Sequence, residues 1–418
     1  MAATIGVIGL GKLGLPVAVT LAMRGHKVLG YDKNPDRMSV SALSPHERGI
    51  DGSTALADAA DASLPLRFAP LKDLLVEVDC VFVLVETPHQ PAYEGTTPLP
   101  ESRADFSYDA LTSVLVDIAR HAPRPMEIGV MSTVLPGTVR ARVLPLVGGH
   151  DIVYCPQFVA MGTVAADLCA PEFTLMGCEG TPAPTVESVL RGLGGAAPVL
   201  VMDYESAELA KMVYNTYISA KVTIANTVQR MAHEVGADAA AVYQVIAAAD
   251  RRILGPAYVG PGMGDGGPCH PRDNIALSWL ARGVGDGSDL FTAVMRSRQA
   301  YVEWLGDLFV DLAGGRPLVL LGTAFKPGTD IEAGSSSVLM ATQLRLAGRQ
   351  VRVVPGPADL GPLEAEPAAY FIGNPEKEFV DHDFPPGSVV VDPWHRVADR
   401  PDVAVHRVGE GPRQVARR

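Results

Sequence analysis

The chain has 418 residues, which is too long for one ordinary hydrophobic core and predicts two or three domains. Hydrophobic residues make up 47% of it and charged residues 20%, the composition of a globular protein rather than a disordered one. A formal net charge of −12 disfavours binding to nucleic acids and acidic membranes, because both require clustered Lys and Arg side chains. An anionic ligand therefore needs a local group of basic side chains.

The N-terminus begins directly on a strand-like pattern and lacks the basic and apolar regions of a signal peptide. No stretch approaches the roughly twenty apolar residues of a membrane span. The cysteines are odd in number and show no CxxC spacing, which is typical of reduced thiols; they are Cys80, Cys155, Cys169, Cys178 and Cys269. These features predict a cytoplasmic protein. The histidines form no metal-ligand spacing, so no metal site is expected.

The first part of the chain alternates strand-like and helical patterns. Short runs rich in β-branched residues are separated, in several places, by amphipathic stretches; the runs lie at residues 4–9, 27–32, 78–87, 128–134 and 151–156. This order is typical of a parallel sheet wound by helices. A doubly wound, Rossmann-like α/β domain is therefore expected over residues 1–200.

Between residues 205 and 235, apolar side chains recur at helical spacing, which predicts a long helix joining two domains. We assign residues 201–300 to this central helical region. After Arg316 the α/β alternation resumes, with one helical stretch at 335–346 and strand-like segments at 317–322, 350–354, 368–373, 388–393 and 402–408. A second, smaller Rossmann-like domain is expected over residues 301–418.

A glycine-rich turn follows the first strand-like segment. Gly9, Gly11 and Gly14 lie between this strand and a helical pattern, and Asp32 closes the next strand. Such glycines allow the backbone to approach a pyrophosphate at a helix N-terminus, while the acid accepts hydrogen bonds from a ribose diol. A carboxylate repels the 2′-phosphate of NADP, so NAD is the expected cofactor. The alternatives are an ordinary tight turn and a surface or capping acid.

Seven segments, in order, resemble the UDP-glucose/GDP-mannose dehydrogenase family along nearly the whole chain. They are GLGKLGLP at 9–16, VETP at 85–88, MSTVLPGT at 131–138, ELAKMVYN at 208–215, ADRRIL at 249–254, PGMGDGGPCHPRDN at 261–274 and GTAFKPGTD at 322–330. The resemblance implies an NAD domain, a central dimerising helical region and a C-terminal nucleotide-sugar domain. It also implies a homodimer and a nucleotide-sugar substrate.

The resemblance implies two successive oxidations by two NAD molecules, with a cysteine forming first a thiohemiacetal and then a thioester that water hydrolyses. Cys269 occupies the position of that cysteine. A thiolate is intrinsically nucleophilic, and the glycines around it leave room for a substrate. The alternative for a single cysteine is a small buried hydrophobic residue, and this is the interpretation for Cys80 and Cys178.

Further catalytic roles are implied for four residues. Lys211 and Asn215 are one helical turn apart and match the family pair that contacts the substrate oxygen and the active-site water. Asp273 matches the aspartate that orients water, or simply caps a helix beginning at Asn274. Thr133 holds a water near the reacting carbon, or is an ordinary turn hydroxyl. Lys211 and Asn215 also allow the plainer interpretation of solvated polar residues.

Binding roles follow from the same resemblance. Thr87 and Pro88 are expected at the cofactor. Lys326 matches the lysine that binds the nucleotide sugar, and Arg252 the arginine that reaches into the partner's site of a dimer; both supply cations to an acidic protein. The full set expected at the substrate is Gln157, Arg252, Gly264, Gly266, Arg272 and Lys326.

Several positions depart from the family pattern. Where the family commonly reads NPEFLxEG, this chain reads CPQFVAMG, so Gln157 replaces the glutamate assigned to thioester hydrolysis and Met161 replaces a second acid. An amide cannot take a proton from water at neutral pH. Because general-base help is typically worth about 10²- to 10⁴-fold, the hydrolytic half of the reaction is placed in question.

Other departures lie near the expected substrate. Asp265 replaces an aromatic residue, Arg272 replaces a lysine, and Ala333 and Gly334 stand where the family has an Arg-Glu pair. His270 adjoins Cys269 and has a suitable pKa for a base. On an extended segment, however, adjacent side chains point to opposite sides, so a packing or surface role is equally consistent.

The sequence therefore predicts an NAD-dependent nucleotide-sugar 6-dehydrogenase that oxidises a C6 primary alcohol to the uronate through Cys269. Two alternatives remain open. One is a two-electron oxidoreductase that stops at the aldehyde or passes the thioester to an acceptor other than water. The other is a catalytically weak nucleotide-sugar-binding protein, which the combination of Cys269, Lys211, Asn215 and Asp273 disfavours.

Overall fold

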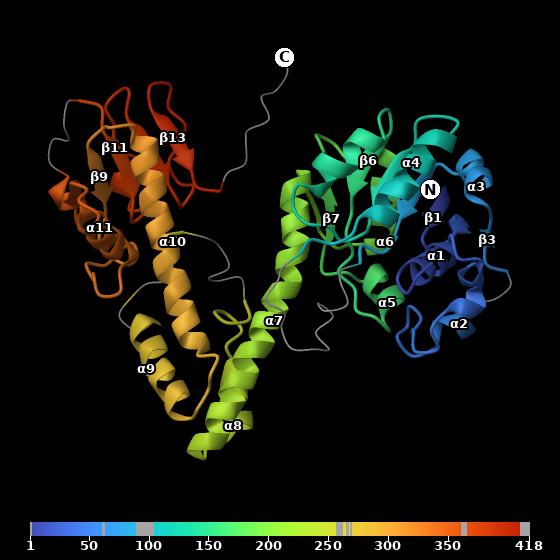
Figure 1. Cartoon of the computed structure of the whole chain (residues 1–418), viewed down its shortest axis with the longest axis horizontal. Coiled ribbons are helices and arrows are strands. Elements are labelled where there is room, and N and C mark those ends of the chain that lie inside the picture. Colours follow the sequence, from blue (N-terminus) through green and yellow to red (C-terminus); the bar gives the residue numbers. More distant parts are fainter. Residues whose placement is uncertain are drawn as a thin grey trace. The chain divides into compact units, whose positions relative to one another are not determined.

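The computed structural model describes residues 2–60, 63–88, 104–255, 262–264, 267, 270–360 and 366–409 (Figure 1). Within its helices, the side chains of six residues are not described: Val222, Asn226, His233, Arg272, Asp273 and Ala276. The chain forms two compact units, Met1–Ala220 and Lys221–Arg418. The boundary falls inside one long helix, so that helix contributes residues to both units.

In the described part of the first unit, one eight-stranded sheet has the order β3-β2-β1-β4-β5-β6-β7-β8. The strands from β3 to β6 pair in parallel, whereas β7 is antiparallel to β6 and parallel to β8. Their bounds are β1 Thr4–Ile8, β2 Lys27–Tyr31, β3 Leu66–Phe68, β4 Cys80–Val83, β5 Glu127–Val130, β6 Asp151–Tyr154, β7 Thr174–Gly177 and β8 Val199–Met202. The short strands β3, β7 and β8 were not predicted.

Helices cover both faces of this sheet, and a separate hydrophobic cluster fills each interface. On one face lie α1 (Gly14–Met23), α5 (Val164–Cys169) and α6 (Pro184–Gly194). On the other lie α3 (Leu71–Glu77), α4 (Asp109–His121) and η4 (Val139–Val143). The central strands are buried on both sides and consequently read as continuous apolar runs. The short helix α2 (Leu56–Ala59) and the turns η1 (Pro35–Arg37), η2 (Val40–Ala42) and η5 (Leu144–Leu146) complete the described elements.

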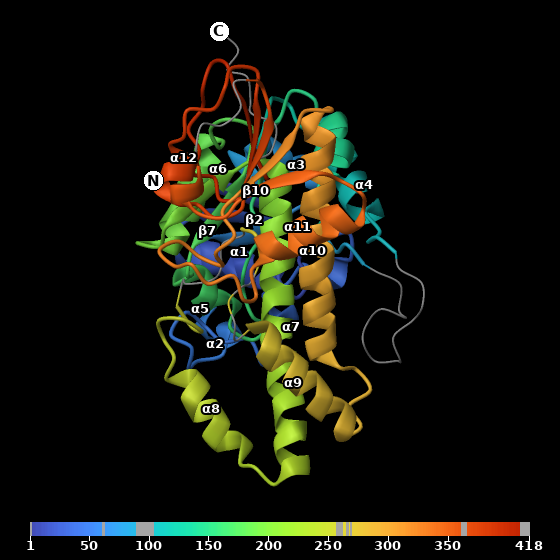
Figure 2. The same cartoon turned by 90° about the vertical axis from the view of Figure 1, so that its left-hand side faces the viewer.

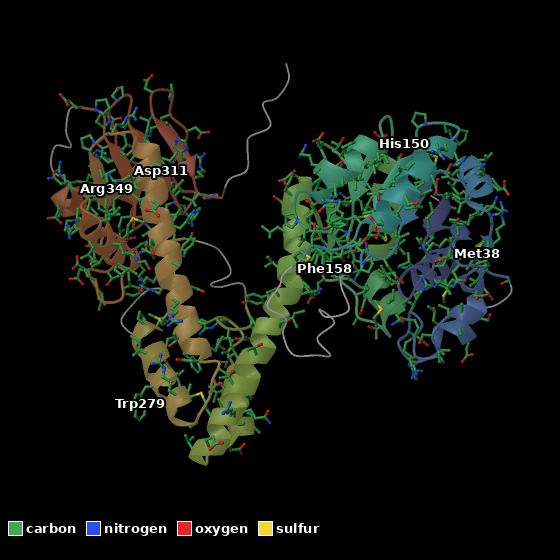
Figure 3. The ribbon with its side chains drawn as sticks, in the orientation of Figure 1. Met38, His150, Phe158, Trp279, Asp311 and Arg349 are labelled. Atoms are coloured by element: carbon green, nitrogen blue, oxygen red, sulfur yellow. The ribbon has the colours of Figure 1, made fainter. Side chains whose placement is uncertain are left out.

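Helix α7 spans Tyr204–Val235, as the apolar spacing predicted. In the second unit it is followed by α8 (Ala239–Ala247), α9 (His270–Gly283) and α10 (Leu290–Ala313), which Figure 2 shows as separate rods. Asp289 begins α10 with its side chain accepting a hydrogen bond from Thr292 N. These helices leave several large apolar side chains exposed, and Trp279 of α9 projects away from the ribbon (Figure 3).

A five-stranded parallel sheet forms the rest of the second unit, with the order β10-β9-β11-β12-β13 among the described residues. Hydrophobic clusters again lie on both of its faces. The strands are β9 Leu318–Leu321, β10 Val351–Val354, β11 Ala369–Ile372, β12 Val389–Asp392 and β13 Ala404–Arg407, and the associated helical segments are α11 Ser336–Leu346, η6 Pro357–Asp359 and α12 Lys377–Val380. The prediction of two doubly wound α/β sheets and a long helix is confirmed.

Candidate active site

The loop from β1 to α1 brings the three predicted glycines together. Gly9 has φ +93°, a conformation that L side chains rarely adopt. A Cβ atom at Gly14 would lie 1.7 Å from the main-chain oxygen of Gly9, so helix α1 can approach this turn only because the residue is glycine. At Gly11 an added Cβ would make only an ordinary contact with Arg37, at 3.6 Å. The turn therefore leaves backbone exposed for a ligand, as a dinucleotide site requires.

Asp32 follows β2 directly and is 6% exposed. Its Oδ2 accepts a hydrogen bond from Leu10 N at 2.8 Å, and its Oδ1 accepts one from Asn34 N at 2.8 Å. The carboxylate is thus fixed beside the glycine turn. Arg37 Nη1 lies 3.8 Å from Asp32 Oδ2 and 3.5 Å from Glu86 Oε1.

A cavity of about 750 Å³ opens over this turn and is large enough for much of a dinucleotide. Gly9, Gly11, Asp32 and Pro88 line it. Thr87 does not belong to its lining; its hydroxyl donates to the main-chain oxygen of Thr133 at 2.7 Å. Thr133 likewise lines neither this cavity nor the second one described below.

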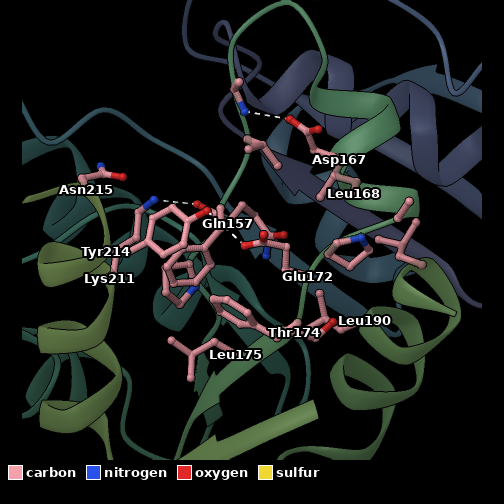
Figure 4. A pocket seen from close by; sticks show the side chains of 18 of the residues that line it. Gln157, Asp167, Leu168, Glu172, Thr174, Leu175, Leu190, Lys211, Tyr214 and Asn215 are labelled. Carbon is pink, nitrogen blue, oxygen red and sulfur yellow. Dashed lines mark hydrogen bonds between the residues drawn. The ribbon is translucent and has the colours of Figure 1, made fainter. Parts of the chain in front are cut away.

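A second cavity in the same unit, of about 430 Å³, is bordered by α7 and by the loop that follows β6 (Figure 4). Lys211, Tyr214, Asn215 and Ile218 line it from α7. Their spacing of three and four residues places them on one helical face. The structure therefore brings Lys211, Asn215 and Gln157 to one cavity.

Lys211 is 8% exposed, although its side chain carries an amine. Its Nζ donates to the main-chain oxygen of Gln157 at 2.7 Å and lies 4.7 Å from the centre of the Phe158 ring. Burial lowers the pKa of Lys211, since desolvation disfavours the ammonium form. The carbonyl and the aromatic ring both favour a cation at this point.

Gln157 lies in the loop between β6 and α5 and is half-buried. Its Nε2 donates to the main-chain oxygen of Cys155 at 2.8 Å, which fixes the orientation of the amide. Met161, the other replaced acid, is 59% exposed and does not line the cavity. Of the two positions, only Gln157 lies at this cavity.

Three aromatic rings and two acids, Asp167 and Glu172, also line the cavity. Phe158 packs edge-on against Phe173 and Tyr214, with both centroid distances 4.8 Å. The Tyr214 hydroxyl donates to Glu172 Oε2 at 3.3 Å. Figure 4 labels both Glu172 and Gln157 among the residues that line the pocket. Glu172 and Tyr214 were not singled out in the sequence analysis.

Glu208 of α7, also not singled out, is completely buried, and its carboxylate lies against the start of η4. Its carboxylate accepts hydrogen bonds from Gly137 N and from Val139 N, the latter at 2.7 Å. Burial raises the pKa of Glu208, and the two backbone hydrogen bonds oppose that effect. The residue joins α7 to the MSTVLPGT segment, which explains why an acid stands one turn before Lys211.

The remaining predicted site residues belong to the second unit. Cys269, Gly266 and Asp265 lie outside the described residues, as do the side chains of Asp273 and Arg272. Arg252 follows α8 and is exposed, Lys326 is exposed with its Nζ 5.5 Å from the Phe325 ring, and Gly264 has φ +97°.

Two local interpretations of this segment were wrong. Helix α9 begins at His270, so Asp273 does not cap a helix that begins at Asn274. For the same reason His270 starts a helix and does not continue an extended segment. The Asn274 side chain donates to His270 O at 2.9 Å, which supports the first turn of that helix.

Of the two cavity residues that the sequence analysis missed, Tyr214 and Glu172, only Tyr214 had a signal in the sequence. Tyr214 is three residues after Lys211, so a helix drawn through Lys211 and Asn215 places it on the same face. Glu172 comes from the loop between α5 and β7, and no spacing relates it to α7. Only the folded chain brings these two residues together.

Comparison with known proteins gives consistent matches. Residues 3–191 match the profile of the UDP-glucose/GDP-mannose dehydrogenase family, NAD binding domain, and residues 205–299 match the central domain of the same family. The chain is 28% identical to a GDP-mannose 6-dehydrogenase of Pseudomonas putida, over 84% of this chain and 80% of the relative. It is 28% identical to a UDP-glucose 6-dehydrogenase of Haloferax volcanii, over 83% and 82%.

A solved structure agrees with these sequence matches. The crystal structure of a ternary complex of GDP-mannose dehydrogenase from Pseudomonas aeruginosa superposes with a TM-score of 0.82. The sequences are 26% identical, and the match covers 96% of this chain and 99% of that one. Among the described helices, none is both long and apolar enough to cross a membrane.

Proposed function

Because the chain belongs to the UDP-glucose/GDP-mannose dehydrogenase family, with an NAD-binding domain, we propose that it oxidises the C6 primary alcohol of a nucleotide sugar to the carboxylate. The observation that carries this proposal is the cavity bordered by Lys211, Asn215 and Gln157, in the same unit as the glycine turn and Asp32. One cavity suits the dinucleotide and the other suits a polar group that is being oxidised.

We assign the cofactor site to Gly9, Gly11, Gly14 and Asp32, with Thr87 and Pro88 at its edge. NAD, when bound, accepts the hydride. The glycine turn presents backbone N–H groups to a pyrophosphate. The Asp32 carboxylate is already fixed by two backbone N–H groups, so it can accept hydrogen bonds from a ribose diol without rearranging.

Cys269 is the proposed nucleophile that adds to the aldehyde and retains the acyl group as a thioester. The buried Lys211 ammonium stabilises negative charge on the reacting oxygen, because a preorganised cation in a desolvated site interacts strongly with developing charge. Asn215 positions the water, and Asp273 and Thr133 assist in holding it. Gly264, Gly266, Arg272 and Lys326 are the proposed contacts to the nucleotide sugar, with Gln157 at the sugar.

The proposed assembly is a homodimer in which Arg252 reaches into the partner's substrate site. The helices of the second unit support this proposal, since they expose large apolar side chains such as Val245 at 69% and Trp279 at 77%. The domain division proposed remains 1–200, 201–300 and 301–418. The four described cysteines are free thiols, which is consistent with the proposed cytoplasmic location.

The two-electron alternative is favoured by one observation, the fixed amide of Gln157 at the position of the hydrolytic acid. A panel of nucleotide sugars that includes GDP-mannose and UDP-glucose tests both functions, with NADH absorbance and product mass as readouts. Formation of a uronate supports the proposal. Release of an aldehyde supports the alternative, and a panel without NAD reduction contradicts both.

A further inference from the structure

The amide of Gln157 leaves the cavity beside Lys211 without an acid at the expected position. A base must still remove a proton from water if the thioester is to be hydrolysed at a useful rate. Among the described residues that line this cavity, two carry carboxylates, Asp167 and Glu172. Their surroundings differ, and this difference separates the two candidates.

Asp167 already has a structural role. Its Oδ2 accepts hydrogen bonds from Ala160 N and from the Thr163 hydroxyl, both at 2.8 Å. These contacts hold the loop that leads into α5 (Figure 4). A proton on Asp167 would weaken both of them, so this carboxylate is poorly suited to accept one.

Glu172 has the opposite environment. It is exposed at the cavity, and the Tyr214 hydroxyl donates to its Oε2 at 3.3 Å. Tyr214 is held in turn by edge-on packing against Phe158, and it lies on α7 between Lys211 and Asn215. One carboxylate oxygen is therefore oriented by a rigid neighbour while the group keeps access to solvent.

We propose that Glu172 is the general base for thioester hydrolysis and that Tyr214 is its positioning residue. This inference rests on the proposed function. As water adds to the thioester carbonyl carbon, Glu172 takes a proton from that water. The carbon–sulfur bond then breaks, Cys269 leaves as the thiolate, and the uronic acid forms. No electrons are exchanged in this step, because both NADH molecules have formed before it.

Burial raises the pKa of Tyr214, and the nearby charge of Glu172 adds to this effect. The phenol therefore remains a hydrogen-bond donor at neutral pH. It can hold Glu172 throughout the reaction without releasing a proton of its own.

The test uses the full-length protein with excess NAD and whichever of GDP-mannose and UDP-glucose the wild type oxidises. In Glu172→Gln we expect a burst of about two NADH per site, followed by a steady rate roughly 100-fold or more below wild type. Protein quenched after the burst should carry the sugar acyl group as a mass adduct. Hydroxylamine, which attacks thioesters without a base, should release the adduct and restore NADH formation.

Two further variants keep this test independent of folding. Glu187→Gln removes an acid that pairs with Arg191 on α6 and does not line the cavity, so wild-type rates are expected. Gln157→Glu combined with Glu172→Gln returns an acid to the loop and should recover much of the lost turnover. NAD affinity unchanged from wild type serves as the control for an intact first unit.

Tyr214→Phe should lower kcat several-fold with little change in KM, since the ring packing stays and only the hydroxyl is lost. If the wild type is active and Glu172→Gln turns over at the same steady rate, this inference is overturned. The dehydrogenase assignment would remain intact in that case. If the wild-type protein fails to reduce NAD with every nucleotide sugar tested, the proposed function is overturned, and this inference falls with it.

Discussion

The Lys211 ammonium donates a hydrogen bond to the main-chain oxygen of Gln157 at 2.7 Å. Lys211, which keeps the family pattern, is thus hydrogen-bonded to Gln157, which departs from it. Because the contact is to the backbone, it does not depend on whether residue 157 is an acid or an amide. Replacement of the acid at position 157 is therefore compatible with a correctly placed Lys211.

Lys211→Met should reduce kcat/KM by about 10²-fold or more, the usual effect of removing one group that stabilises an oxyanion. Its pH dependence provides a sharper test. Burial lowers the pKa of Lys211 below its ordinary value of 10.5, so the cation is lost as pH rises through that lowered pKa. The alkaline limb of the wild-type kcat/KM profile should have its midpoint below 10.5.

The methionine variant should lose that alkaline limb while retaining NAD affinity. Met212→Leu, one residue along α7 and absent from the cavity lining, is the matched control and should behave as wild type. A methionine variant with an unchanged alkaline limb would assign the titration to another group.

Gly14→Ala and Gly11→Ala should separate folding from cofactor binding. At Gly14 the added Cβ meets Gly9 O at 1.7 Å, so the turn must move and stability should fall by about 3 kcal/mol or more. At Gly11 the nearest atom is 3.6 Å away, so the fold should tolerate the methyl group. Gly11→Ala should instead weaken NAD roughly tenfold, since the methyl group covers backbone that the pyrophosphate approaches.

Thermal unfolding and NAD titration check this pair. If both variants lost stability equally, the contrast between the two glycines drawn from the structure would be incorrect.

Asp32→Asn should weaken NAD by roughly 10- to 100-fold, because hydrogen bonds to a charged acceptor are worth about 1.5–3 kcal/mol. It should also relax the rejection of NADP, with Arg37 close enough to interact with a 2′-phosphate. Asp36→Asn, in the same turn but exposed, is the control. Equal NAD affinity in the Asp32 variant would remove this residue from the cofactor site.

Arg252 can be tested by subunit complementation. Arg252→Ala and Cys269→Ser chains should each be inactive alone. The serine variant loses activity because a hydroxyl without a base is a poor nucleophile, but it should still bind NAD. If Arg252 serves the partner's site, mixed dimers regain one complete site, and an equal mixture should recover about a quarter of wild-type activity. No recovery in dimers shown to exchange subunits would indicate that Arg252 acts within its own chain.

The fold was largely predictable because its signals are local. The alternation of apolar strands with amphipathic helices defined both sheets, and the position of Asp32 after β2 followed directly from that alternation. Strands β3, β7 and β8 were missed. Strand β3 has only three residues, and exposed Leu200 and Val201 of β8 belong to an edge strand without an alternating pattern.

The candidate site was predictable only where residues share one element. Lys211 and Asn215 are related by the helical repeat, so their common face could be predicted. The contact between Glu172 and Tyr214 joins residues 42 positions apart, and nothing local to either segment encodes it. His270 was misplaced because the glycines and prolines before it suggested an extended segment, whereas α9 begins at that residue.

The stoichiometry of NADH formed per nucleotide sugar consumed tests the central claim most directly, with product mass measured in the same reaction. A four-electron dehydrogenase forms two NADH and a uronate, and this is the result we predict. One NADH with release of an aldehyde would contradict it, and so would two NADH with transfer of the acyl group to an acceptor other than water in place of a uronate.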